Sequence, residues 1–296
     1  MTIARFAFDL LVLTKYRITS TALFTGWVAL VVHGALNGGA HPWSAQWPVL
    51  LAMFGVGGAA NCLNQIFERH KDARMERTRT VRPLAAGRMS VWIAWVWAAL
   101  LFVGGSALFV FVCGSWLAAA LGAFTVLYYS FFYTLYLKPR HHLNIVIGGV
   151  PGAMGPVLAW AAIDGGLALP PLLMAAVIVL WTPPHAWALA IHIRDDYARA
   201  GIPMLPVVKG VDETTRQIFA YTVVLVAATL ALPWLSRGFG WWFLLAAVVL
   251  GAVFIAKAWA LWRARPMPEP RALFRYSLIY IAGLFAGLVA DAWSAP

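Results

Sequence analysis

The chain contains nine apolar stretches, each close to the length that crosses a lipid bilayer, and this feature restricts its fold more than any other. A transmembrane helix needs roughly 20 apolar residues. Because a bilayer offers backbone amides no partner, such segments must be helical. The sequence therefore predicts an all-α, polytopic membrane bundle of nine transmembrane helices that forms a single domain, 1–296. The stretches are 18–37, 47–67, 91–112, 115–136, 143–163, 170–193, 217–236, 240–262 and 273–293.

Composition agrees with a membrane protein and argues against a soluble one. Hydrophobic residues make up 62% of the chain and charged residues 11%, whereas a soluble domain carries about 25% charge. The 16 Trp and nine Tyr fit aromatic belts at the membrane surfaces. The net charge of +11 could suggest nucleic acid, but its distribution indicates topology instead, and no nucleic-acid partner is expected.

The basic residues predict the orientation of the bundle. If the N-terminus is cytoplasmic, the cytoplasmic segments and adjoining helix ends hold 21 of the 22 Lys and Arg residues, and only Arg237 falls outside. Positive charge concentrates on the cytoplasmic side of membrane proteins. We therefore expect a cytoplasmic N-terminus.

A first polar patch follows the second apolar stretch, in "NQIFERHKDARMERTR". Asn64, Glu68 and Asp72 are spaced i, i+4, i+8 and so share one helix face. Their oxygens suit Mg²⁺, which binds through a few carboxylates and substrate phosphates. The alternative is an ordinary basic loop whose acids pair with bases. It explains Asn64 and Glu68 less well, because polar groups near membrane depth are costly and usually functional.

A second patch ends the sixth stretch. His185, His192 and Asp196 are spaced seven and four apart, so on one continuous helix they share a face. Asp195 joins them only if the helix ends there. The alternative is a solvated helix end. The two histidines are candidates for metal or haem ligands, proton carriers or packing residues, and the sequence leaves these roles open.

Other features lie near the same membrane side. Lys15 and Arg17 precede the first stretch, and Lys138 follows the fourth; each either contacts a diphosphate or only sets topology. Pro183 and Pro184 should kink or break the sixth helix. Four tyrosines at the inner end of the fourth stretch fit either an interfacial belt or a surface that stabilises a cation, namely Tyr128, Tyr129, Tyr133 and Tyr136.

Four segments carry a resemblance to a known family. They are "LTKYRIT", "LNQIFERHKDARMERTR" with "RPLAAGR", "NIVIGGVPGAMGPVLAWAA", and "WTPPHAWALAIHIRDDYARAGIPMLPVV". Over nearly its whole length the chain resembles the protohaem IX farnesyltransferases, or haem O synthases, of the UbiA-type prenyltransferase superfamily. The acid motifs alone indicate only prenyl transfer, whereas "NIVIGG" and the "PPHAWALA" to "GIPMLP" segment resemble the haem branch.

The resemblance implies a helical bundle around a central cavity. It implies Mg²⁺-dependent transfer of a farnesyl group from farnesyl diphosphate to a vinyl group of haem B, giving haem O for terminal oxidases. Catalytic and metal-binding positions are Asn64, Glu68, Asp72 and Asp196, with Asp195 as a further metal ligand. Diphosphate-binding positions are Arg17, Lys71, Arg77, Arg79, Arg82, Lys138 and Arg199. Haem candidates are His185, His192 and Tyr197.

The same resemblance implies a location and partners. The chain is expected in the bacterial inner membrane, among membrane lipid, with its active site on the cytoplasmic side. Haem A synthase or an assembling terminal oxidase are candidate partners. One departure from the family is His70, where an acid is usual. Since His70 is two residues from Glu68, we expect it on a different helix face.

Two alternative functions remain at the level of sequence. A UbiA-type enzyme acting on a quinone precursor would share the acid motifs. A non-catalytic haem or quinone carrier, or a transporter, would also place acids in membrane helices, although transporters hold such groups near the midplane rather than at helix ends.

Overall fold

Helices dominate the computed structural model, which describes residues 2–264 and 266–294; within those ranges there is no β-strand. Nine helical segments in the described residues are long and apolar enough to cross a membrane, which confirms the predicted architecture. They are α2 (Tyr16–Leu36), α3 (Trp43–Asp72), α5 with η1 (Val91–Val112), α6 with η2 (Trp116–Leu137), α7, η3 and α8 (Asn144–Asp164), α9 (Leu169–His192), α12 (Gly210–Leu235), α13 (Trp241–Arg263) and α14 (Pro270–Ser294).

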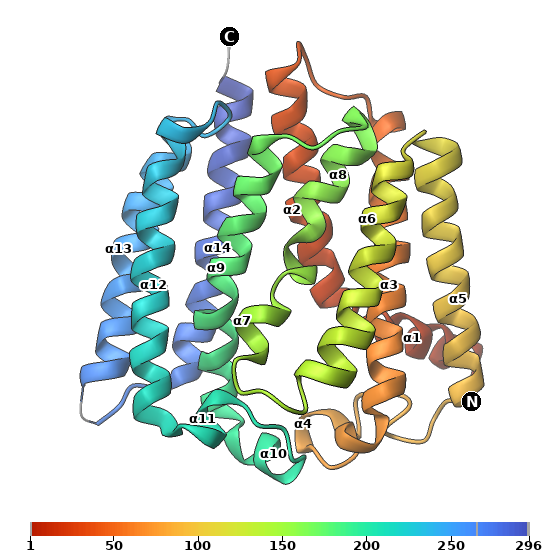
Figure 1. Cartoon of the computed structure of the whole chain (residues 1–296), viewed down its shortest axis with the longest axis vertical. Coiled ribbons are helices and arrows are strands. Elements are labelled where there is room, and N and C mark those ends of the chain that lie inside the picture. Colours follow the sequence, from red (N-terminus) through yellow and green to blue (C-terminus); the bar gives the residue numbers. More distant parts are fainter. Residues whose placement is uncertain (1, 265, 295–296) are drawn as a thin grey trace.

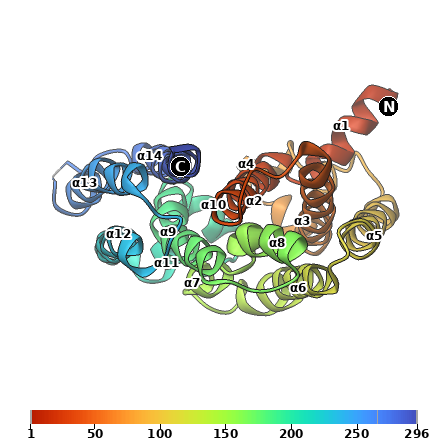
Figure 2. The same ribbon diagram turned by 90° about the horizontal axis from the view of Figure 1, so that it is seen from above.

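The long helices form a flattened ring (Figure 2). Each spanning segment contacts the next along the chain, and α14 contacts α2, which closes the ring. Further contacts join segments on opposite sides of the ring, among them α2 with α8, α3 with α6, and α9 with α14. Segments distant in sequence therefore meet around one interior.

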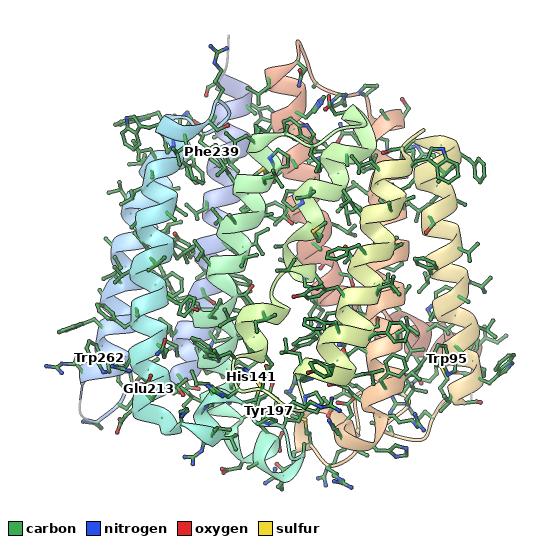
Figure 3. All side chains as sticks on the ribbon, in the orientation of Figure 1. Trp95, His141, Tyr197, Glu213, Phe239 and Trp262 are labelled. Atoms are coloured by element: carbon green, nitrogen blue, oxygen red, sulfur yellow. The ribbon has the colours of Figure 1, made fainter. Side chains whose placement is uncertain are left out.

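Four short helices lie at one end of the bundle (Figure 1). They are α1 (Ile3–Leu13), α4 (Glu76–Arg79), α10 (Arg194–Arg199) and α11 (Leu205–Val208). We call this end the basic end, because its loops and short helices carry Lys15, Arg82, Lys138 and Arg199. In Figure 3, Trp95 and Trp262 project from opposite sides of the bundle near this end, as expected for an interfacial aromatic belt.

The sixth membrane segment does not break at its prolines. Pro183 and Pro184 lie inside α9, which continues from Leu169 to His192. The prediction was a kink or a break, and the break is wrong; a kink stays a prediction. Neighbouring helices can hold a proline-containing membrane helix together, and α9 packs against both α12 and α14.

A wide-turned helix completes the fourth membrane segment. Residues Tyr128–Leu137 form the π-helix η2, in which the backbone N–H of Lys138 donates to the Tyr133 carbonyl five residues earlier (2.8 Å). The Thr134 hydroxyl likewise donates to the Tyr129 carbonyl (2.7 Å). π-Helical turns are rare and often occur at functional sites, and this one leads directly to Lys138.

The closest approach of α3 and α5 gives a stability prediction. A Cβ added to Gly55 would lie 2.7 Å from the Leu101 carbonyl oxygen and 2.9 Å from the Gly105 Cα. Backbone atoms cannot easily move aside, so Gly55→Ala should destabilise the bundle by about 2 kcal/mol. Thermal unfolding in detergent should show a lower midpoint. Gly104→Ala, on α5 with nothing within 4 Å of the added carbon, is the control and should leave the midpoint unchanged; equal midpoints for both variants would contradict this packing.

Candidate functional site

Three polar side chains on one face of α3 form the centre of the candidate site. Asn64, Glu68 and Asp72 lie near the end of the helix and none is more than 4% exposed. Their burial on a common side agrees with the predicted i, i+4, i+8 face. His70 is exposed, so it points away from them, as expected. Burial of two carboxylates in this position requires compensating positive charge.

Each of the three side chains has a cationic partner. The Lys15 ammonium donates to Asn64 Oδ1 (2.6 Å), and the Lys138 ammonium lies 2.6 Å from Glu68 Oε1. The Arg82 guanidinium pairs with Asp72 and lies 3.9 Å from Glu68 Oε2. The three cations come from separate chain segments, so the fold assembles a row of alternating charge at the basic end.

The backbone at Lys15 is adapted to this position. Lys15 has φ +48° and is the only non-glycine residue of the described chain with a positive φ. A left-handed conformation is unfavourable for a side chain with a Cβ, and such strain concentrates at functional sites. It turns the chain between α1 and α2 where Lys15 meets Asn64.

The π-helix supplies two tyrosine rings to the site. Tyr129 and Tyr133 stack with centroids 5.4 Å apart, with Lys15 over the first ring (5.7 Å) and Lys138 over the second (6.0 Å). Gly148 gives Tyr133 room, because a Cβ there would lie 2.2 Å from its ring. Tyr136, by contrast, is 58% exposed. The predicted aromatic surface thus divides between site residues and membrane-facing ones.

The two lysines differ electrostatically. Burial alone would lower the pKa of Lys138, but the Glu68 carboxylate outweighs it and raises that pKa above its usual value. Burial and the neighbouring Arg82 hold the pKa of Lys15 well below its usual value, despite the opposing effect of Glu68. Lys138 is therefore a fixed positive charge at neutral pH, and Lys15 gives up its proton more readily.

The donors of this site suit Mg²⁺ only together with a phosphate ligand. Asn64 and Asp72 are eight residues apart, about 12 Å along the helix axis, so the α3 oxygens cannot surround one ion. Within the described residues, no three His, Cys, Asp or Glu side chains gather closely enough to hold a metal. Amide and carboxylate oxygens with phosphate oxygens completing the coordination are the usual Mg²⁺ arrangement. The residues present fit that arrangement.

The second patch is organised differently from the prediction. α9 ends at His192, and Asp196 lies on the separate helix α10, so the predicted common face of His185, His192 and Asp196 is wrong. The chain changes direction at Ile193, whose φ and ψ of −113° and 32° are not helical. Asp195 is exposed. A metal role for Asp195 or Asp196 stays a prediction.

Asp196 connects α10 to the loop that carries Arg82. Its carboxylate accepts the backbone N–H groups of Glu76 and Arg77 (3.2 Å each) and pairs with Arg199. Burial would raise the pKa of Asp196, but these amides and Arg199 lower it below its usual value. A depressed carboxyl pKa means that the bridge is charged at neutral pH and is lost only as the pH falls through that lowered value.

Removal of this bridge should loosen the loop after α3. Asp196→Ala removes two hydrogen bonds from backbone N–H groups to a charged acceptor, worth about 3 kcal/mol together, or roughly 150-fold in the opening of the segment. Limited trypsin digestion should cut faster after Arg77 and Arg79, both exposed. Asp195→Ala is the control on the same helix. Equal cleavage rates in the two variants would show that Asp196 does not hold the loop.

The other predicted diphosphate residues are less central. Of the seven, Arg82 and Lys138 contact the α3 acids. Arg199 pairs with Asp196 and Glu76. Arg17 is exposed, packs on Tyr16 and is one of the residues that line the cavity described below. Three more lie at the surface or partly buried without a described contact to those acids, namely Lys71, Arg77 and Arg79. Lys15 was not among the seven, and the sequence left open whether it contacts a diphosphate or only sets topology. In the structure it contacts Asn64 directly, which Arg17 does not.

A cavity of about 720 Å³ adjoins the polar row. Its walls come from α2, α3, α6 with η2, the α7–α8 segment, α9 and α14. Its polar end includes Asn61 and Tyr129, next to Asn64 and Lys15. Most other lining residues are apolar or glycine. Pockets of 300–1,000 Å³ hold small organic ligands and cofactors. The cavity therefore has largely apolar walls and a polar end beside Lys15 and Asn64.

Only one of the three predicted haem residues lines this cavity. His185 does, between the rings of Trp181 and Phe274. His192 is exposed and lies 3.9 Å from Glu269. Tyr197 lies at the basic end (Figure 3), close enough to Lys138 to raise its pKa. Neither His192 nor Tyr197 lines the cavity.

Sequence comparison identifies relatives over almost the full chain. Residues 22–282 match the UbiA prenyltransferase family. A protoheme IX farnesyltransferase from Novosphingobium aromaticivorans is 44% identical, with 96% of this chain and 92% of the relative covered. That of Rhodopseudomonas palustris is 42% identical (96% and 90% covered), and that of Erythrobacter litoralis 39% (97% and 93%).

Solved structures share the fold at low sequence identity. A digeranylgeranylglyceryl phosphate synthase superposes with a TM-score of 0.76 at 18% identity, covering 96% of this chain and 97% of the other. The apo UbiA homologue from Aeropyrum pernix gives 0.72 at 19% identity (94% and 98% covered). A UbiA homologue from Archaeoglobus fulgidus, bound to GPP and Mg²⁺, gives 0.60 at 15% identity (95% and 99%).

Proposed function

The chain belongs to the UbiA prenyltransferase family, in its protohaem IX farnesyltransferase branch, and we propose that it transfers a farnesyl group from farnesyl diphosphate to a vinyl group of haem B. One observation carries the proposal. The buried row of Asn64, Glu68 and Asp72, each with a cationic partner, lies at the end of an apolar cavity. The product is haem O, on the way to the haem A of terminal oxidases.

The polar row binds and activates the diphosphate. Lys15, Arg82 and Lys138 are held near the α3 oxygens and can turn to phosphate oxygens without leaving the site. Together they neutralise charge that develops on the leaving group, the main task of catalysis here. Asn64, Glu68 and Asp72 would hold Mg²⁺, which when bound supplies further charge stabilisation to the departing diphosphate.

The cavity receives the apolar parts of both substrates. The farnesyl chain lies among the α2, α8 and α9 side chains, and the reacting carbon lies at the Tyr129 end, beside the diphosphate. The Tyr129 ring face stabilises the allylic cation. Exclusion of water from this end protects the cation until the vinyl group of haem B attacks it. His185 is the haem-side residue of the chamber.

The location and orientation in the membrane are inferred from the distribution of Lys and Arg and from the bacterial relatives. The chain is an integral membrane protein with bacterial relatives. The concentration of Lys and Arg at the basic end supports a cytoplasmic active site, in the inner membrane of a bacterium. Haem A synthase or a terminal oxidase under assembly would receive the product.

The choice of prenyl acceptor, haem B or a quinone precursor, distinguishes the proposed function from that of a UbiA-type enzyme of quinone synthesis. Purified protein with Mg²⁺ and farnesyl diphosphate should release diphosphate and form haem O when haem B is supplied, and should not prenylate 4-hydroxybenzoate. Prenylated phenol in place of haem O would assign the chain to quinone synthesis. Absence of diphosphate release with either acceptor would favour a carrier.

A further inference from the structure

His185 is held in one orientation at the wall of the cavity. Its ring lies between Trp181 (centroids 4.1 Å apart) and Phe274 (4.4 Å), nearly parallel to both. Its Nδ1 lies 2.7 Å from the hydroxyl oxygen of Ser277, a fully buried residue. The Trp181 indole N–H donates to the Ser277 carbonyl (2.7 Å), which ties α9 to α14 at the same point. The ring therefore has little freedom to rotate.

The hydrogen bonds determine which ring nitrogen carries the proton. The Ser277 hydroxyl donates its one hydrogen to the Phe274 carbonyl (2.7 Å), which can only accept. The bond between Ser277 and His185 must then be donated by Nδ1–H. In the neutral ring, Nε2 is consequently unprotonated and a hydrogen-bond acceptor. The Ser277 contact uses Nδ1, and His185 is part of the cavity wall.

His185 lies at a depth similar to that of Asn64, the member of the polar row farthest from the basic end. It precedes the α9 end at His192 by seven residues, about 10 Å along the axis. Asn64 precedes the α3 end at Asp72 by eight residues, about 12 Å. Both helices end at the basic end of the bundle, so His185 lines the chamber at a depth similar to that of Asn64.

From this geometry we infer that His185 is the base that accepts a proton from the water completing the reaction, with Ser277 as its positioning residue. The inference rests on the proposed function. After the farnesyl carbon bonds to the terminal vinyl carbon, the inner vinyl carbon is positive. Water forms a C–O bond to that carbon while one of its protons moves to Nε2. The product is the hydroxyl of haem O, and the imidazolium later releases the proton to solvent.

The surroundings of the ring leave less room for a porphyrin than for a water molecule. The rings of Trp181 and Phe274 cover the two faces of the His185 ring. Coordination through Nε2 would bring the porphyrin plane to about 2 Å from that nitrogen, the usual metal–imidazole distance. The rings of Trp181 and Phe274 would each need to stay about 3.5 Å from that porphyrin plane. A water molecule at Nε2 is small and does not reach either ring.

Product analysis of His185→Gln tests the inference. The ionisation step does not use His185, so diphosphate release should stay within a few-fold of wild type. Haem O should fall about 100-fold, the low end of general-base contributions. A product lighter by one water should replace it, because the cation then loses a carbon-bound proton to the diphosphate. Ser277→Ala should shift the products in the same direction, and His192→Gln, on the same helix but exposed, should form haem O as wild type does.

Three outcomes would overturn the inference. His185→Gln that forms haem O alone would exclude the base role, whatever its rate. Loss of haem O without the lighter product, together with an altered absorption spectrum of bound haem B, would make His185 an iron ligand. Wild-type protein that forms no haem O would remove the proposed function itself, a result that differs from a shift of products confined to the variants.

Discussion

Glu68→Gln is expected to reduce farnesyl transfer by about 1,000-fold, the upper range for removal of one electrostatic contact to a developing charge. Glu68 is buried, lies between Lys138 and Arg82, and is the central member of the α3 row. The neutral amide keeps the shape of the side chain but can no longer counter the two cations or share a metal ion. The rate of diphosphate release, measured with saturating substrates, reports the loss.

Stability must be separated from catalysis in this variant. Glu68→Gln leaves the buried Lys138 without its counter-charge, which should cost about 3 kcal/mol of stability. The double variant Glu68→Gln with Lys138→Met removes both charges and should recover most of the melting temperature without activity. Glu213→Gln, which breaks a partly exposed pair with Arg216, is the control and should remain active. Full activity of Glu68→Gln would refute the role given to the α3 row.

Chelation of divalent metal should abolish diphosphate release, and added Mg²⁺ should restore it. The α3 oxygens hold ammonium and guanidinium groups, and they lie too far apart to surround one ion without phosphate. We therefore expect Mg²⁺ to raise the melting temperature of the protein only when inorganic diphosphate is also present.

The control for the melting experiment compares two variants in their binding of Mg²⁺ and diphosphate. Glu68→Gln should lose the joint stabilisation by Mg²⁺ and diphosphate, whereas Glu213→Gln should keep it. Equal stabilisation by Mg²⁺ in the absence of diphosphate would mean that the protein alone forms the metal site. Unchanged activity in excess chelator would contradict a metal-dependent reaction.

The bundle and the first patch could be predicted because each has a local physical cause. Apolar length determines the spans, since a bilayer excludes unsatisfied backbone groups. Helical periodicity places Asn64, Glu68 and Asp72 on one face, and their burial follows from the packing of α3.

The second patch could not be predicted in the same way. The turn at Ile193 that separates Asp196 from the histidines has no glycine or proline to signal it. The partners of Asp196 are backbone amides of Glu76 and Arg77, about 120 residues earlier in the chain, and side-chain spacing says nothing about such contacts.

Lys15 and the π-helix show a further limit. The segment "LTKYRIT" marks Lys15 and Arg17 equally, and only the left-handed backbone of Lys15 directs it to Asn64. The wide turns of η2 have no sequence signature, yet they lead from the stacked tyrosines to Lys138. Such selection among similar residues depends on tertiary contacts.

The most direct test of the central claim is the mass of haem extracted from cells that contain haem B and express this chain. Wild-type protein should give haem heavier than haem B by one farnesyl group and one hydroxyl group, and cells expressing Glu68→Gln should give only haem B. Unmodified haem B in wild-type cells, with membrane-inserted protein and farnesyl diphosphate present, would contradict the account.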